Sequence, residues 1–314
     1  MKAFLKRLLV GDNEVREYPP IRIPGDIPEK VYLEMAGTMT HVSQNHWLLC
    51  IEPVIFGIWI KQDEREVSYE QQEQYHLYFF DSADNARNKK KASAIVTLSF
   101  CDCIKEKNGM LLLLKVIKSN IYHLDFLRRY VLFSRCYKKN GLTFSKFKSF
   151  TAAYSYPRRI RLISFKQDDY YNIFPMDLLG NVNGSKRFVF GLRHTNVSLS
   201  RIIETGKLVV SEVSFNHKNT ILELGKHHSS KPPSLDSLTF DLVPSKNFGF
   251  YLPDWINSYK EIKILETKNL GSHMLLWGEV LQENTLSEAG DNLFLIHFFE
   301  YLHQKNNGSA YLLA

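Results

Sequence analysis

Short apolar runs separated by polar turns fill the first half of the chain. Turn-forming stretches lie between the runs, as in DSADN at residues 81–85 and KNG at residues 107–109. Runs of this length, bounded by turn residues, are typical of β-strands. The strands predicted here occupy residues 47–51, 54–60, 76–80, 94–100 and 110–117. Residues 1–30 are polar and contain several prolines, which favours an irregular lead-in.

The second half repeats this pattern with clearer spacing. Its predicted strands occupy residues 161–165, 187–192, 207–214, 237–243, 261–267 and 273–281. Six short strands with turns between them favour a barrel or a sandwich. Residues 124–137 fit either a helix or a pair of strands, and residues 292–304 fit a short helix.

One amphipathic helix is predicted among these strands, at residues 197–205. The apolar residues that share one face at helical spacing are Leu199, Ile202 and Ile203. Thr195 or Asn196 can serve as the N-cap, and Gly206 suits the position after the last turn. A helix this short depends on packing against the sheet.

Length and composition indicate a globular protein of two domains. Domains usually have ~100–200 residues, so 314 residues predict two, and we place the boundary at residue 150. Hydrophobic residues make up 44% of the chain, which is enough for a packed core, and the 21 Phe and 16 Tyr favour strands. We therefore expect a mainly β fold with a few helices, divided into residues 1–150 and 151–314.

The formal charge of +7 is compatible with nucleic acid, a membrane surface or an anionic small molecule as partner. The basic clusters at residues 87–91 and 158–161 are short. They are typical of solvated turns and strand edges, with a phosphate-bearing ligand as the alternative. No ordered nucleic-acid motif accompanies them, so we expect neither nucleic acid nor a membrane as partner.

The sequence also bears on location and metal binding. No apolar run approaches the ~18 residues of a transmembrane helix, and Lys6 and Arg7 make the N-terminal run too charged for a secretory signal. Four cysteines, with one C-x-C at residues 101–103 and no second pair at zinc spacing, predict reduced thiols and no metal. His227 and His228 are interpreted as solvated loop residues. We expect a cytoplasmic protein.

The residues that precede the predicted helix are the first candidates for chemistry. They combine a cation with hydroxyl and amide groups and are Arg193, His194, Thr195, Asn196 and Ser198. Free N–H groups and the dipole at a helix N-terminus favour an anion such as phosphate. Simple capping by Thr195 or Asn196 explains the same residues, and the spacing leaves both interpretations open.

A second candidate is the NIFPMD segment at residues 172–177, with Asn172, Phe174, Pro175, Met176 and Asp177. Pro175 lacks a backbone donor, so we expect the strand to leave its ladder there and expose backbone groups to a flat heteroaromatic ring. The alternative is an edge-strand proline with no ligand. The sequence has no G-x-S-x-G, P-loop or G-x-G-x-x-G motif, which weighs against a Rossmann-type dehydrogenase.

Several stretches of the second half resemble, in order, the flavin-reductase-like family of FMN-binding split β-barrels. They are YPRRIRLIS at 156–164, NIFPMD at 172–177, SLSRIIETG at 198–206, KLVVS at 207–211, LPDWI at 252–256, LGSHMLLWGEV at 270–280 and GSAY at 308–311. Each stretch is weakly specific alone, and the ordered set is more specific. It covers about half of the chain.

The resemblance implies an FMN-binding split β-barrel in residues 151–314 that forms a homodimer. In this family the flavin contacts the segment matched by residues 172–177, and its phosphate the loop and helix start matched by residues 193–198. The family includes NAD(P)H-dependent flavin reductases and flavoredoxins. The implied activity is that of a flavin-dependent oxidoreductase with FMN as cofactor and NADH or NADPH as electron donor, and no catalytic side chain is assigned.

Three residues depart from the family pattern. Asp177 stands where serine or threonine is common, Val197 replaces an acidic residue, and Arg201 replaces an asparagine. These departures favour FMN binding over a particular reductase activity, and they leave a non-catalytic flavin-binding or structural protein as the alternative. Residues 1–150 lie outside the resemblance. Their β-rich pattern and similar size suggest a degenerate second barrel, which would make the monomer an internal pseudo-dimer.

Overall fold

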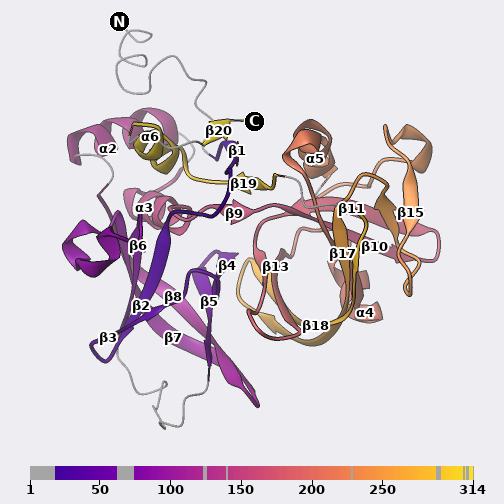
Figure 1. Ribbon diagram of the computed structural model, residues 1–314, viewed down its shortest axis with the longest axis horizontal. Helices are drawn as coiled ribbons and strands as arrows, with labels where there is room; N and C mark the ends of the chain where they lie inside the picture. Colours follow the sequence, from indigo (N-terminus) through magenta and orange to yellow (C-terminus); the bar gives the residue numbers. More distant parts are fainter. Residues whose placement is uncertain are drawn as a thin grey trace, which may run out of the picture. The chain divides into compact units, whose positions relative to one another are not determined.

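The computed structural model describes residues 18–61, 74–122, 126–138, 141–227, 229–287, 291–306, 308 and 311–313. These residues form two compact units. Unit 1 contains the described parts of Met1–His46, Ile58–Pro157 and Leu295–Leu313, and unit 2 those of Trp47–Gly57 and Arg158–Phe294. Each unit is built around a seven-stranded sheet (Figure 1).

The first sheet follows the alternation of apolar and polar residues in the sequence. In β7 (Ala94–Glu106), for example, Ala94, Val96 and Leu98 are fully buried on one face. The other strands of this sheet are β2 (Lys30–Met35), β3 (Thr38–His41), β4 (His46–Ile51), β5 (Val54–Lys61), β6 (Tyr75–Phe80) and β8 (Gly109–Ile121). Beside it, β1 (Pro20–Arg22) pairs with β20 (Leu312–Leu313).

Helical segments complete unit 1. They are η2 (Asn85–Arg87), η3 (Lys89–Lys91), α2 (Phe126–Leu132), the π-helical turn η4 (Phe133–Tyr137), α3 (Phe144–Ala153) and α6 (Phe298–Asn306). The hydroxyl of Thr143 accepts a hydrogen bond from the Lys146 amide at 3.2 Å, so α3 begins with a side-chain cap. This helix packs on β8, where Ser119 Oγ donates to Ser149 Oγ at 3.2 Å.

The sheet of unit 2 is curled (Figure 1). Its strands are β10 (Arg161–Gln167), β11 (Tyr170–Met176), β12 (Leu179–Asn181), β13 (Arg187–Arg193), β14 (Lys207–Glu212), β17 (Ser258–Asn269) and β18 (His273–Thr285). The remaining elements are β9 (Arg158–Arg159), α4 (Leu199–Thr205), η6 (Phe215–His217), α5 (Lys218–Leu224), η7 (Gly225–His227), η8 (Leu235–Ser237), β15 (Leu242–Pro244), β16 (Tyr251–Pro253) and β19 (Leu293–Leu295). The mainly β fold expected from the sequence is confirmed.

The two sheets have the same topology. The first runs β3-β2-β6-β7-β8-β5-β4 and the second β11-β10-β14-β17-β18-β13-β12. When the strands of each sheet are numbered along the chain, both orders read second, first, fifth, sixth, seventh, fourth, third. In both, the sixth and seventh strands form a long antiparallel hairpin with register shifts. The first half therefore repeats the strand order of the second.

The two units differ in the connection between their fifth and sixth strands. In unit 1, residues 81–93 join β6 to β7 through two short 3₁₀ turns. In unit 2, residues 213–257 join β14 to β17 and contain α5 and the β15–β16 hairpin. This longer connection packs beside β10 and β11, because Tyr171 donates a hydrogen bond to the Pro233 carbonyl and Lys166 Nζ to Tyr251 Oη, the latter at 3.2 Å.

The β4–β5 hairpin is divided between the two units. Its tip, residues 47–57, belongs to unit 2, and we call it the arm. The arm lies so close to β12 and β13 that only glycine fits there. A Cβ atom on Gly180 would lie 1.7 Å from Trp47 Nε1, and one on Gly191 would lie 1.9 Å from the Leu49 carbonyl oxygen. The Ser272 amide also donates to the carbonyl of Glu52 at 2.7 Å.

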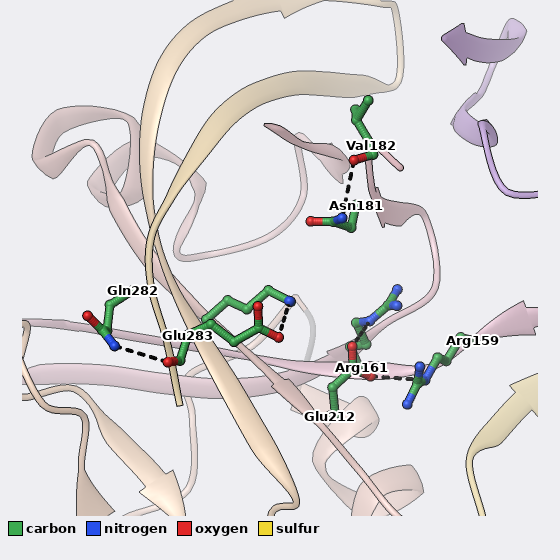
Figure 2. A network of polar contacts seen from close by, with 8 residues as sticks. Arg159, Arg161, Asn181, Val182, Glu212, Gln282 and Glu283 are labelled. Atoms are coloured by element: carbon green, nitrogen blue, oxygen red, sulfur yellow. Dashed lines mark hydrogen bonds and ion pairs between the residues drawn. The ribbon is translucent and has the colours of Figure 1, made fainter. Parts of the chain in front are cut away.

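An ion cluster fixes the start of β10 (Figure 2). Glu212 on β14 faces Arg161 on β10, with 2.7 Å between its Oε1 and Arg161 Nε and 2.9 Å between its Oε2 and Arg159 Nε. Burial alone would raise the pKa of Glu212, but Arg161 and Arg159 outweigh it and hold this pKa below its ordinary value. Loss of one partner would leave a buried charge without its counter-ion. The cluster therefore holds β10 against β14, and β10 pairs in turn with β11.

Most strands predicted from the sequence are confirmed, with some corrections. Residues 124–137 contain the helix α2 among the described positions. Of the short helix predicted at residues 292–304, α6 confirms the part from Phe298, whereas Leu293–Leu295 form the strand β19. The strand predicted at residues 237–243 is wrong, because only Leu242–Pro244 pairs, with β16. The strands β11 and β12 were absent from the six predicted in this half. Among the described residues, no helix is long and apolar enough to cross a bilayer.

Candidate functional site

The first candidate segment lies on the edge strand of the unit 2 sheet. β11 pairs with β10 from Gln167↔Tyr170 to Arg161↔Met176, so the ladder continues through Pro175. The expectation that the strand leaves its ladder at this proline is wrong. β11 is the end strand of the sheet, where a missing donor on the outer side breaks no bond. Gly225, the first residue of η7, lies against this proline, because a Cβ atom on Gly225 would be 3.2 Å from Pro175 Cγ. η7 therefore covers Pro175.

The residues of this segment alternate between the two faces of β11. Asn172, Phe174 and Met176 share one face and are 0%, 1% and 9% exposed. Pro175 points to the other face and is half-buried. Asp177 follows the strand and is also half-buried. The Asn172 side chain is therefore a buried polar group within an apolar row, which makes its hydrogen bonds informative.

The second candidate segment joins β13 to α4. The Asn196 amide donates to the Arg193 carbonyl at 3.0 Å, which closes a turn directly after the strand. Asn196 Oδ1 then accepts a hydrogen bond from the Ser198 amide at 2.9 Å. Arg193, His194 and Thr195 are exposed, whereas Asn196 is buried. His194 is fixed from both sides, by its amide on the Ser272 carbonyl and by its ring on Asn269 Oδ1, each at 3.2 Å.

The start of α4 differs from the prediction. The helix begins at Leu199, and its N-cap is Ser198, not Thr195 or Asn196. The Ser198 side chain makes no capping hydrogen bond. Asn196 satisfies the Ser198 amide in a local side-chain turn instead. Gly206 has the left-handed conformation, with φ of 63°, so its predicted place after the helix is confirmed.

Ser198 joins the two candidate segments because its hydroxyl turns away from the helix. Asn172 Nδ2 donates to Ser198 Oγ at 2.8 Å, and Tyr170 Oη lies 2.9 Å from the same oxygen. Asn172 and Ser198 are fully buried. Within the described parts of the chain, Asn172 Oδ1 has no hydrogen-bond partner. A buried acceptor without a partner costs about 1–3 kcal/mol, so the Asn172 oxygen is an unusual feature of this core.

Sequence reasoning missed Tyr170 and named Arg201 only as a departure from the family pattern. The Arg201 guanidinium carbon lies 4.4 Å from the centre of the Tyr170 ring, a cation–π distance. Tyr170 is two residues before Asn172 on a strand, and Arg201 is three residues after Ser198 at a helix start. Strand and helix periodicity therefore place both beside residues that had been singled out. With them, the site has a buried centre and an exposed rim that carries Arg193, His194 and Arg201.

The remaining predicted residues lie further from this centre along their elements. Phe174 and Met176 follow Asn172 on the same face of β11 and are buried in unit 2. Among the described residues, no group of three or more His, Cys, Asp or Glu side chains is arranged to hold a metal ion. The arrangement combines a buried hydrogen-bond acceptor with cations and a hydroxyl at the surface.

Comparisons with known proteins give matches by structure. No family model matches the chain, and no curated protein matches its sequence. Among solved structures, it is similar to the NADH:FAD oxidoreductase of Streptomyces globisporus, with 16% identity, a TM-score of 0.43, and coverage of 48% of this chain and 88% of that one. It is also similar to an FMN-binding protein from Thermus thermophilus, with 16% identity, a TM-score of 0.39, and coverage of 44% and 81%.

A third similar structure is a flavoredoxin from Methanosarcina acetivorans, with 14% identity, a TM-score of 0.36, and coverage of 41% of this chain and 69% of that one. The solved structures that resemble this chain thus include flavin reductases, a flavoredoxin and FMN-binding proteins. Each resembles about half of it or less.

Proposed function

We propose that unit 2 binds FMN at the site formed by β11 and the β13–α4 turn, and that the protein is a flavin-dependent oxidoreductase. The observation that carries the proposal is the buried Asn172 side chain, whose amide nitrogen donates to Ser198 Oγ while its oxygen, which solvent does not reach, has no hydrogen-bond partner among the described residues. The two segments that resemble flavin-contacting motifs are thereby in direct contact.

The residues present fit the chemical groups of FMN. A flavin ring has an N–H donor, which matches Asn172 Oδ1 in chemistry, and a hydrogen bond between them would require the side chains that enclose this oxygen to move. A phosphate suits the exposed guanidinium of Arg193 and the hydroxyl of Thr195, because charge-assisted hydrogen bonds to phosphate are the stronger kind. His194 is held in place beside them by Asn269. The surface charges at the site favour an anion over a cation.

Bound FMN would supply the hydride-accepting ring, so the reaction requires no protein acid or base. The role of the chain is to bind and orient. Asn172 would fix one edge of the ring, and Arg193, His194 and Thr195 would hold the phosphate. We propose NADH or NADPH as the electron donor.

Replacement of Arg193 by alanine is expected to weaken FMN binding about tenfold, because a tenfold change in Kd equals about 1.4 kcal/mol, a modest value for a charged contact to phosphate. The measurement is quenching of FMN fluorescence on titration with the full chain. Lys186→Ala is the matched control, since Lys186 is an exposed cation just before β13, at the other end of the same strand. It should leave Kd unchanged.

The outcomes of this titration decide the proposal. A protein that takes up no FMN at micromolar concentrations contradicts it. Equal weakening by Arg193→Ala and Lys186→Ala would show attraction by overall charge and no phosphate site at the β13–α4 turn. Thr195→Val provides a further check, because it removes a hydroxyl from the same turn without changing charge.

A non-catalytic flavin-binding protein is the alternative, favoured by the departures at Asp177, Val197 and Arg201. Arg201 lies against the Tyr170 ring, so this substitution changes the surface next to Asn172. Oxidation of NADH and NADPH in the presence of FMN separates the two functions. Turnover well above that of free flavin supports the oxidoreductase, and turnover at that background supports the alternative.

We also propose that the chain functions as an internal pair of related barrels, with no need for a homodimer. The identical strand order of the two sheets supports this assignment. The mass in solution, measured by light scattering during gel filtration, should correspond to one chain of 36.6 kDa. A mass of twice that value at micromolar concentration would favour the homodimer.

A further inference from the structure

The surface of unit 1 around α2 exposes large apolar side chains. Phe126, Leu127 and Tyr130 are 65%, 70% and 47% exposed. The Phe126 and Tyr130 rings stack with 6.2 Å between centroids, and Phe144 meets them edge-on at 6.3 and 5.9 Å. Phe126, Tyr130 and Phe144 form one aromatic patch, and the exposed Leu127 follows Phe126 in the chain. This grouping is unlike the single apolar side chains scattered over most protein surfaces.

Cations lie near this patch. Residues 126–150 contain seven Lys and Arg and no Asp or Glu, so this stretch alone carries +7, the formal charge of the whole chain. The charges come together from three elements, with Lys118 on β8, Arg129 on α2 and Lys148 on α3. Lys148 Nζ lies 5.7 Å from the centre of the Phe144 ring.

These cations are close enough to repel one another. Burial lowers the pKa of Lys148, and the neighbouring charges of Arg129 and Lys118 lower it further. Like charges held together cost free energy, and an anionic partner offsets that cost. The face therefore combines exposed apolar area with a local excess of positive charge.

We propose that this face binds the surface of a bilayer that contains anionic phospholipids. Phe126, Leu127 and Tyr130 would enter the boundary between headgroups and acyl chains, and Lys118 and Lys148 would pair with lipid phosphates. Apolar burial and attraction to anionic lipid add together in such interfacial contacts. This inference is independent of FMN binding, and it replaces the expectation of no membrane partner.

Two other anionic or apolar partners fit the same observations less well. A single-stranded nucleic acid could stack its bases on the aromatic rings, but it offers little to the aliphatic Leu127, which is 70% exposed. A second copy of the chain would bring another +7 charge against the first. The combination of aliphatic, aromatic and cationic side chains is typical of membrane interfaces.

Co-sedimentation of the full chain with lipid vesicles tests the proposal. We expect binding to vesicles of phosphatidylcholine with phosphatidylserine, weaker binding to phosphatidylcholine alone, and loss of binding as salt is raised. The Phe126→Ser, Leu127→Ser double variant should reduce the partition coefficient at least about tenfold. Leu281→Ser is the matched control, since Leu281 is 49% exposed on β18 of unit 2, and its binding should equal that of the wild type.

Charge is tested separately with the Lys118→Glu, Lys148→Glu variant. It should lose the preference for phosphatidylserine, whereas Lys231→Glu, a reversal at an exposed lysine of unit 2, should keep it. Thermal melts verify that each variant is folded. Absence of vesicle binding by the wild type overturns the proposal. So does vesicle binding that the double serine variant retains, tighter binding to a single-stranded oligonucleotide, or self-association that the serine variant abolishes.

Discussion

Replacement of Gly191 by alanine is expected to lower the free energy of unfolding by about 3 kcal/mol or more. The new methyl group would lie 1.9 Å from the Leu49 carbonyl oxygen and 2.8 Å from Leu49 Cα. Both atoms are backbone of the arm, so no rotamer change relieves the overlap. The strands must separate, which costs the close packing between the arm and β13.

Thermal unfolding followed by circular dichroism measures the effect. A loss of this size corresponds to a fall in Tm of roughly 6–12 °C for a unit of about this length. Gly225→Ala is the matched control, because Gly225 has an ordinary helical conformation and a Cβ there would lie 3.2 Å from the Pro175 ring. Its effect should stay within about 1 kcal/mol. A Gly191→Ala variant as stable as the wild type would show that the arm does not lie against β13.

A double-mutant cycle distinguishes backbone from side-chain overlap. At Gly180 the overlap is with the Trp47 ring, because a Cβ there would lie 1.7 Å from its Nε1. Trp47→Ala removes that ring, so the Gly180→Ala and Trp47→Ala effects should be strongly non-additive. The changes in unfolding free energy caused by Gly191→Ala and by Trp47→Ala should be almost additive. Non-additivity at Gly191 as large as at Gly180 would contradict the arrangement of the arm.

The arm marks the limit of what the sequence predicts. Gly180 and Gly191 lie within apolar runs, and a glycine in a strand signals a close approach without naming the approaching segment. That segment is Trp47 and Leu49, more than a hundred residues earlier. The identical strand order of the two sheets is equally hidden, because it depends on pairings between strands far apart in the chain. Apolar periodicity, which is local, predicted ten of the fourteen strands of these two sheets.

The candidate site shows the same division. Family-like motifs drew attention to both segments, but their contact through Asn172 and Ser198 joins residues 26 positions apart and follows from the curl of the sheet. The interpretation of Pro175 was wrong because an isolated strand does not reveal which of its sides is paired. The strand predicted at residues 237–243 was wrong because an alternating pattern does not guarantee a partner. Motifs and periodicity therefore identified the candidate residues, whereas the pairing of distant strands determined which of them are in contact.

A buried carboxyl group in unit 1 is the basis of the second large effect. Glu29 is 2% exposed and Glu300 is fully buried. Gln304 Nε2 donates to Oε1 of both carboxyl groups at 3.1 Å, and the Tyr311 hydroxyl donates to Glu29. Burial raises the pKa of Glu29 to about 8, and the charge of Glu300 contributes, whereas Tyr311 and Lys30 oppose the rise.

Stability should therefore decrease as pH rises from about 4.5 to about 8. In that window folded Glu29 keeps a proton that the unfolded chain has lost, and the state with more bound protons is weakened by rising pH. The slope from this group is at most about 1.4 kcal/mol per pH unit. Glu29→Gln places a neutral amide at the same position, so its Tm should exceed that of the wild type at pH 8 and approach or fall below it near pH 4.5.

Glu34→Gln is the control with the opposite sign. Hydrogen bonds from Lys89 and Tyr78 lower the pKa of Glu34, so its carboxylate stabilises the folded state at neutral pH and loses that effect on acidification. The glutamine variant should be less stable than the wild type at pH 7 and similar to it in acid. Subtracting the wild-type stability from that of each variant at every pH removes the contributions of all titrating groups that the two proteins share. A Glu29→Gln difference that is constant between pH 5 and 8 would show that Glu29 is ionised throughout, with its charge compensated inside unit 1.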